Sequence, residues 1–175
     1  MYKKQNIKYI SEIGIIAALY IAMGMLFAST SFGIFQIRIA EAFTIMPAIK
    51  KKYIYSLTIG CFLTNLVGFQ IGCNPLGLVD VFLGTLATCV SAILTYKLRY
   101  YKIKGLPIIA TIPPVLINAV IIGAEVTYIA KGTIFDIFFL HSSLCIGVGQ
   151  FISCTVIGTA LFWIFRRISA MEKFV

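Results

Sequence analysis

Acidic and titratable residues are scarce in this chain of 175 residues. It has 6 Asp and Glu residues and a single histidine, His141, and only 12% of its residues are charged. A water-soluble domain carries about twice that share of charge, and a disordered chain is poor in aromatic residues, which make up 14% of this one. With 60% hydrophobic residues, the composition indicates a protein embedded in a lipid bilayer.

Several motifs of catalysis and energy coupling are also missing. The sequence has no GxxxxGK[ST] loop for ATP phosphates, no HExxH, no GxSxG and no CxxC. One histidine cannot form a two-histidine metal site. We therefore expect no enzyme activity, no metal and no cofactor in this chain.

Long apolar segments dominate instead. A helix needs roughly 20 apolar residues to cross about 30 Å of hydrocarbon. Six segments predict an all-α membrane protein, with residues 1–175 forming one integral membrane domain. The predicted spans are Ile10 to Ala28, Ile37 to Ile49, Tyr53 to Phe69, Leu78 to Tyr96, Leu106 to Ala130 and His141 to Phe165. The second is the shortest, because its residues would reach only about 20 Å as an α-helix.

Basic residues fix the predicted orientation. With six crossings, 13 of the 15 Lys and Arg residues fall on one side, and basic loops are typical of the cytoplasmic side. They are Lys3, Lys4, Lys8, Lys50, Lys51, Lys52, Lys97, Arg99, Lys102, Lys104, Arg166, Arg167 and Lys173. Both termini are thus predicted to be cytoplasmic in a multi-pass cell-membrane protein. The net charge of +9 then reflects topology and does not indicate nucleic acid as a partner.

Six polar residues lie within the predicted spans or at their ends. They are Arg38, Glu41, Asn65, Asp80, Asn118 and Glu125. An ionisable group inside a spanning helix costs on the order of 2.5 to 3.5 kcal/mol on insertion scales, so each needs a reason to be there. Their positions along four predicted helices place them together in the outer half of the bundle. Pro113 and Pro114, in the middle of the fifth span, are expected to kink the helix below Asn118.

This convergence predicts a polar pocket that opens outward. Three carboxylates against one guanidinium give it a formal charge of −2. Such a site favours a small solute that is cationic or rich in N–H donors, such as a guanine-like edge. Simpler roles for single residues stay open: Asp80 could cap a helix, Arg38 could reach the interface, and Arg38 could pair with Glu41 one turn away.

Small residues recur every four positions on the first predicted helix, at Gly14, Ala18 and Ala22. Such stripes let two helices approach closely. Packing within the bundle and docking onto another membrane protein both fit this pattern.

Four segments carry a resemblance to a known family. They are RIAEAFTIMP at 38–47, GCFLTN at 60–65, DVFLGTLAT at 80–88 and PPVLINAVIIG at 113–123. With six short spans and the small-residue stripe, the sequence resembles the substrate-binding S component of an energy-coupling factor (ECF) transporter. More specifically, it is similar to the QueT family of queuosine-precursor importers.

The resemblance implies a mechanism and partners. An S component captures its solute from outside and topples in the bilayer against a transmembrane coupling subunit that two cytosolic ATPases drive. ATP would then be used only by the partner subunits, and Gly14, Ala18 and Ala22 would contact the coupling subunit. The implied ligand is a 7-deazaguanine such as prequeuosine.

A second function remains open from the residues alone. In an autonomous channel or ion-coupled carrier, the same carboxylates would relay protons or cations. Uptake without ATP or other subunits would distinguish that function from an S component.

Overall fold

The computed structural model describes residues 2–32 and 36–171, with side chains over 6–32 and 36–167. Throughout these residues the chain is helical apart from its connections. The helices are α1 (Tyr2–Leu26), α2 (Ala28–Ser31), η1 (Ile39–Ala48), α3 (Tyr53–Gln70), α4 (Leu78–Leu98), η2 (Ile108–Thr111), α5 (Ile112–Lys131), α6 (Ile137–Gln150), η3 (Phe151–Ile157) and α7 (Gly158–Met171). The all-α fold class is therefore confirmed.

Within the described residues, four helical stretches are long and apolar enough to cross a membrane. They are Asn6–Leu26, Leu78–Leu98, Ile108–Lys131 and Ile137–Arg167. The last joins α6 and α7 through the π-helical turns of η3, so it is longer than the predicted sixth span. Large apolar side chains remain exposed along these helices, among them Leu86, Leu116 and Leu144, as lipid contact requires.

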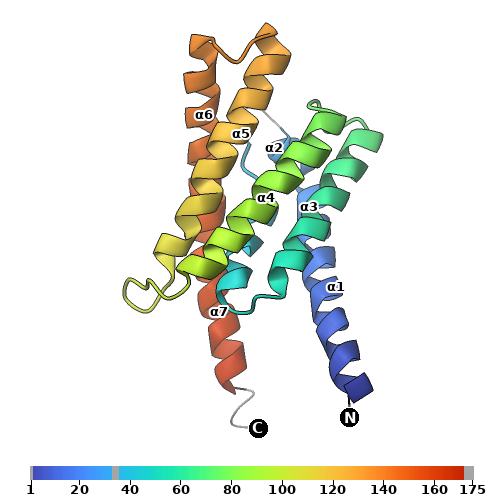
Figure 1. Cartoon of the computed structure of the whole chain (residues 1–175), viewed down its shortest axis with the longest axis vertical. Helices are drawn as coiled ribbons and strands as arrows, with labels where there is room; N and C mark the ends of the chain where they lie inside the picture. Colours follow the sequence, from blue (N-terminus) through green and yellow to red (C-terminus); the bar gives the residue numbers. More distant parts are fainter. Residues whose placement is uncertain (1, 33–35, 172–175) are drawn as a thin grey trace.

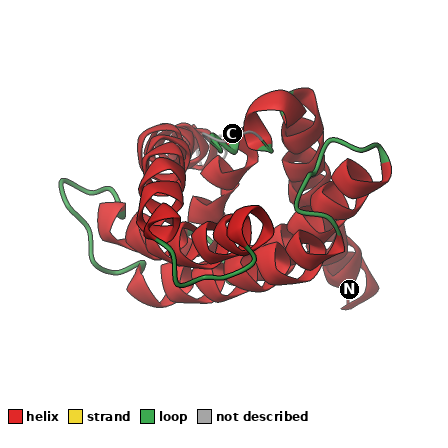
Figure 2. Ribbon diagram, turned by 90° about the horizontal axis from the view of Figure 1, so that it is seen from above, coloured by secondary structure: helices red, strands yellow, loops and turns green. Residues whose placement is uncertain are grey.

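The elements pack in a simple order around a buried centre. α1 packs on α3, α3 on α4, α4 on α5 and α5 on α6 (Figure 1). η1 lies inside this arrangement, where it contacts α1, α3, α4 and α7. Its residues from Ala40 to Pro47 are all buried. Seen from above, the connecting loops lie at the periphery of the bundle (Figure 2).

The second predicted span is a 3₁₀-helix, and this changes its reach. η1 has only 10 residues and begins at Ile39. A 3₁₀-helix rises about 2.0 Å per residue, so the residues of η1 span about 20 Å. The predicted α-helix at 37–49 needed more residues to span the same length. Close packing on every side allows this less stable helix type to persist over more than its usual three or four residues.

The predicted proline kink is wrong. Pro113 and Pro114 lie in the first turn of α5, directly after the short 3₁₀-helix η2. The first N–H groups of a helix have no partner within it, so proline at this position removes no hydrogen bond from α5. Leu106, where the fifth span was predicted to begin, forms an isolated β-bridge with Ile103, and helix begins only with η2.

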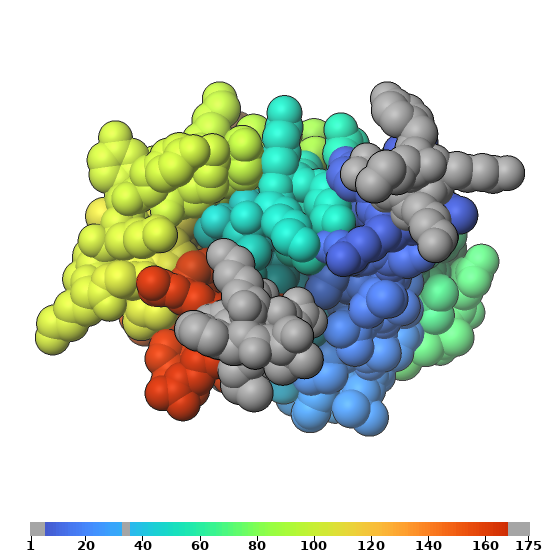
Figure 3. Space-filling view, turned by 90° about the horizontal axis from the view of Figure 1, so that it is seen from below, coloured from blue at the N-terminus to red at the C-terminus, as the bar shows by residue number. Residues whose placement is uncertain are grey.

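The basic segments share one end of the bundle. The start of α1, the end of α7 and the connections at 49–52 and 99–107 lie together at the bottom of Figure 1. From below, residues near 50 lie between the start of α1 in blue and residues near 100 in yellow-green (Figure 3). We call this the basic end. The side chains of Lys3, Lys4 and Lys173 lie outside the described residues.

A glycine on α6 allows the chain entering η1 to approach closely. A Cβ on Gly149 would lie 2.9 Å from the carbonyl carbon of Gln36, whereas one on Gly147 would lie 3.5 Å from the Ala119 side chain. Gly149→Ala should therefore lower stability by about 1 to 3 kcal/mol. Gly147→Ala should be neutral or stabilising, since alanine favours a helix. Thermal unfolding of the two variants in detergent tests this, and equal melting temperatures would contradict it.

Candidate functional site

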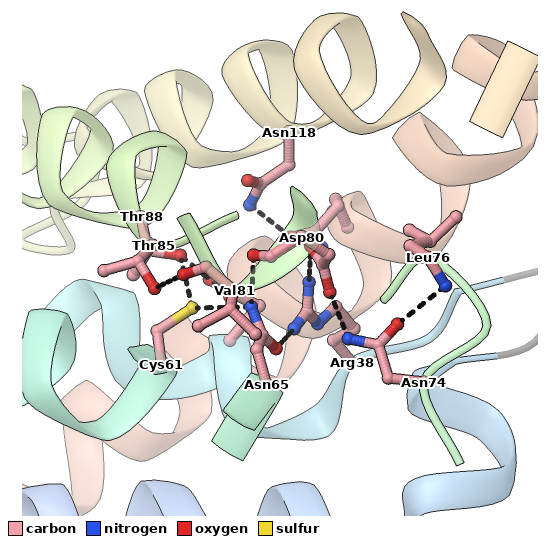
Figure 4. Close-up of polar contacts among 12 residues, drawn as sticks. Arg38, Cys61, Asn65, Asn74, Leu76, Asp80, Val81, Thr85, Thr88 and Asn118 are labelled. Carbon is pink, nitrogen blue, oxygen red and sulfur yellow. Dashed lines mark hydrogen bonds and ion pairs between the residues drawn. The ribbon is translucent and has the colours of Figure 1, made fainter. Parts of the chain in front are cut away.

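Arg38 is the centre of a buried polar cluster. It precedes η1, and its guanidinium donates a hydrogen bond to Asn65 Oδ1 of α3 and lies 3.8 Å from Asp80 Oδ1 of α4 (Figure 4). The Phe32 ring covers it, with 5.6 Å between the guanidinium and the ring centroid. Arg38 is 4% exposed, so these contacts replace water almost completely.

Local structure at the start of α4 holds Asp80. Gly77, with a φ of 72°, turns the chain into α4 and places Asp80 in the first turn. Asn74 Nδ2 donates to Asp80 Oδ2 at 2.7 Å, and Asn65 Nδ2 donates to the Asp80 carbonyl at 3.0 Å. Gly84 leaves the space for this arrangement, because a Cβ there would lie 2.8 Å from Asn65 Nδ2. Four elements thus meet through Arg38, Asn65, Asn74 and Asp80.

Glu41 lies deeper in the same group of polar residues. Tyr20 of α1 and Thr88 of α4 donate hydrogen bonds to its Oε1, at 2.5 and 3.3 Å. Within the described part of the chain, Glu41 Oε2 has no hydrogen-bond partner. The structure pairs Arg38 with Asp80 and forms no ion pair between Arg38 and Glu41 among the described residues.

The α5 and α6 side carries the remaining polar groups. Asn118 Nδ2 donates to Gln150 Oε1 at 3.3 Å, and the Cys154 thiol donates to the same oxygen at 3.2 Å. Gln150 Nε2 and both oxygens of Glu125 lack partners among the described residues, although Gln150 is fully buried and Glu125 is 5% exposed. Asn118 points from α5 toward the part of the cluster that holds Asp80 (Figure 4).

All six predicted site residues are therefore buried, at 5% exposure or less. Three of them, Arg38, Asn65 and Asp80, form one connected unit. Glu41 binds Tyr20 and Thr88, Asn118 binds Gln150, and Glu125 makes no hydrogen bond among the described residues. The six side chains are thus almost completely shielded from solvent.

An open groove lies next to this closed cluster, away from the basic end. Its volume is about 460 Å³. The groove is lined by Phe32, Gln36, Pro75, Leu76, Val126, Ile129, Ala130, Phe138 and His141. Phe32 forms both the groove wall and the cover over Arg38, and the Leu76 amide donates to Asn74 Oδ1. The groove therefore shares its walls with the polar cluster.

The sequence did not single out three partners of the site. Asn74 lies in the connection before α4, Tyr20 lies on the buried face of α1, and Thr88 follows Asp80 by two turns on α4. The sequence alone gave little reason to select these residues, because threonine and tyrosine are common in spanning helices and Asn74 lies in a loop. The eight-residue spacing from Asp80 to Thr88 places both on one helix face and could have identified Thr88.

The small-residue stripe on α1 faces away from the bundle. Gly14, Ala18 and Ala22 are all exposed, and a Cβ on Gly14 would meet nothing within 4 Å. The opposite face of α1, with Ile16, Tyr20 and Gly24, packs on the bundle. Packing within this chain therefore does not account for the stripe.

These features define a class: a multi-pass α-helical membrane protein with an ion pair and free polar atoms enclosed between its helices. The sequence profile described as QueT transporter matches residues 10–167, so the chain belongs to the QueT transporter family. It is 36% identical over 90 residues to the "Queuosine precursor transporter QueT" of Lactococcus lactis subsp. cremoris (strain MG1363). That stretch is 50% of this chain and 49% of the relative, so the chain spans about half the length of this relative. No solved structure matches.

The ion pair at the cluster centre gives a testable coupling. Asp80→Leu leaves a buried guanidinium without its carboxylate, and Arg38→Met leaves a buried carboxylate without its guanidinium. Each substitution should lower the free energy of unfolding by about 3 kcal/mol or more. The double variant Arg38→Met/Asp80→Leu should lower the free energy of unfolding by less than the sum of the two single effects, because neither charge is then left buried without its partner. Chemical unfolding of all four proteins in detergent measures this difference. Additive costs would show that the two side chains do not interact.

Proposed function

We propose that this protein is the substrate-binding S component of an ECF-type transporter and captures a queuosine precursor of the 7-deazaguanine class. The observation that carries the proposal is the buried set of polar atoms without partners, enclosed next to a groove of ligand size. Membership of the QueT transporter family supports it. So does the similarity to the Lactococcus relative, which is named a queuosine precursor transporter.

The chemistry of the free atoms supports a guanine-like ligand. Glu41 Oε2 and both Glu125 oxygens are acceptors without a partner among the described residues, and Gln150 Nε2 is such a donor. Asp80 Oδ1 makes no hydrogen bond there and has only its ion pair with Arg38. The edge of a 7-deazaguanine offers several N–H donors beside one carbonyl acceptor. Carboxylates bind adjacent N–H groups through two parallel hydrogen bonds, and an amide N–H suits a carbonyl. An aminomethyl cation on the ligand would be favoured by the excess of carboxylates.

The membrane topology in this proposal has six crossings with both termini in the cytoplasm. α3, at 18 residues, would reach about 27 Å, and η1 with its extended entry would form the remaining crossing. The gathering of basic segments at one end supports a cytoplasmic basic end. The groove beside the cluster would then open to the outside.

Energy would come from partner subunits. In this proposal a transmembrane coupling subunit and two cytosolic ATPases drive import, which fits a sequence that has no ATP-binding loop of its own. The exposed stripe of Gly14, Ala18 and Ala22 is the surface we assign to the coupling subunit, since small residues permit a close helix-to-helix approach.

Binding of the ligand should depend on Glu125. Isothermal titration of the purified protein with prequeuosine should saturate, and Glu125→Gln should weaken binding by about tenfold or more, because hydrogen bonds to a charged group are lost. Asp136→Asn makes the same chemical change at the N-cap of α6, outside the cluster, and should leave binding unchanged. Equal affinity in wild type and Glu125→Gln would remove Glu125 from the binding site.

Energy coupling to the partner subunits should depend on the small-residue stripe of α1 and not on the buried polar cluster. Ala18→Leu should abolish ATP-dependent uptake in proteoliposomes that contain the coupling subunit and ATPases, because a bulky side chain prevents close helix approach. Ligand binding by this variant should be unchanged.

Ala160→Leu adds the same bulk at an exposed position of α7 and is the matched control for uptake. Loss of uptake in the control as well would show that the effect is not specific to the stripe. Uptake by the chain alone, without ATP, would contradict the S-component role and indicate an autonomous carrier.

A further inference from the structure

Two hollows adjoin each other on the outer surface near the basic end. The first is a groove of about 410 Å³ between α3 and α4, lined by Lys51, Ile54, Tyr55, Thr58, Ile59, Cys89 and Ile93. The second is a concavity of about 540 Å³, lined by Tyr9, Lys50, Lys51, Lys52 and Tyr55. Because Lys51 and Tyr55 line both, the two form one continuous surface. It is apolar along the helices and basic at its end.

The basic part of this surface is held in place by Glu12 of α1. Its Oε2 lies 3.0 Å from Lys50 Nζ and 2.6 Å from Lys52 Nζ, and it accepts a hydrogen bond from Tyr53. The three lysines against Glu12 carry a formal charge of +2. Lys51 is exposed and forms no ion pair with any described carboxylate. An ordered cationic surface thus retains one ammonium group that is free to bind an anion.

The apolar part fits a hydrocarbon chain. Ile54 and Ile59 on α3 face Ile93 and Cys89 on α4 across the groove, and Ile59 and Ile93 are 48% and 38% exposed. A lipid acyl chain buries such surface favourably when it lies along it and fills the notch between two helices. Tyr55, at the boundary between the two hollows, has the amphipathic side chain that is typical of the headgroup level.

Arginines at the same end of the bundle are bound within the chain. Arg99 donates to the Tyr96 carbonyl at 2.6 Å and stacks on the Tyr96 and Tyr100 rings. Arg166 donates to the Gly105 carbonyl at 3.2 Å. Lys51 differs because it borders both an apolar groove and a basic concavity.

We propose that these two hollows together bind one anionic glycerophospholipid. Its phosphate lies against Lys51 and Tyr55, and one acyl chain follows the groove between α3 and α4. Charge complementarity and the continuity of the basic and apolar parts carry this assignment. It does not depend on which solute the protein transports.

Competition between two lipids tests the proposal. The full chain in neutral detergent is mixed with equal amounts of phosphatidylglycerol and phosphatidylcholine of identical acyl chains, and native mass spectrometry measures the ratio of bound lipids. Wild type should retain phosphatidylglycerol preferentially. Lys51→Gln should lower this preference about fivefold, the effect of one lysine near an anionic headgroup.

Matched variants distinguish lipid binding at this site from a general effect of the protein's net charge. Lys102→Gln removes the same charge from an exposed position in the connection between α4 and η2 and should leave the preference at its wild-type value. Ile59→Trp fills the groove and should reduce the amount of either lipid that is bound. Equal effects of Lys51→Gln and Lys102→Gln would overturn the proposal, because only the net charge would then matter.

Two further outcomes would also overturn it. Displacement of phosphatidylglycerol by soluble glycerol 1-phosphate would show that the surface takes a free phosphate and needs no acyl chain. An unchanged lipid preference in Lys51→Gln, together with weaker co-purification of a coupling subunit, would assign the surface to a protein partner. Thermal unfolding of each variant checks that the exposed substitutions leave the fold intact.

Discussion

The fold depends on keeping one guanidinium stable where water is absent. Arg38 is buried between η1, α3 and α4, and its charge is tolerated because Asp80 lies opposite and Asn65 accepts a hydrogen bond from it. Asn65 and Asn74 in turn fix Asp80, and Gly77 and Gly84 permit the backbone positions that this requires. Since the residues come from separate elements, the network joins helices that apolar packing alone would leave free to slide.

A closed polar cluster has consequences for transport. In the proposed function, a ligand would supply hydrogen bonds to buried atoms that have none among the described residues, which would favour its binding. In the proposed function the solute would pass the wall of the groove at Phe32, whose ring covers Arg38. Phe32 would then both cover the site and border its entrance, so that recognition and opening would be linked.

Composition and charge placement predicted the all-α membrane fold, since hydrocarbon permits few alternatives to helices. The bounds of α3 and α4 also agreed closely with the apolar segments, whereas η1 and the start of α5 did not. Hydropathy records where a segment is apolar but not its helix type, so the 3₁₀ geometry of η1 and the first-turn position of Pro113 were not predictable. Tertiary packing decides both.

For the site, depth along each predicted helix indicated that Arg38, Asn65 and Asp80 converge, and the structure joins them. The depth of a polar side chain in the membrane does not show which residue is its hydrogen-bond or ion-pair partner. The sequence offered only Glu41 as a possible ion-pair partner for Arg38, whereas the structure pairs Arg38 with Asp80. Depth also could not identify Asn74, whose position depends on the turn before α4. The outward face of the stripe on α1 likewise required the structure, because one helix alone does not show which side its neighbours occupy.

The 3₁₀ geometry of η1 limits where proteins of this family can gain or lose residues. Each residue of a 3₁₀-helix advances the chain by about 2 Å and turns it by about 120°, so one added or deleted residue would carry Arg38 around the axis and away from Asp80. Gaps between related sequences should thus collect in the connections at 71–77, 99–107 and 132–136. The stretch from Ile39 to Ala48 acts as a spacer of fixed length.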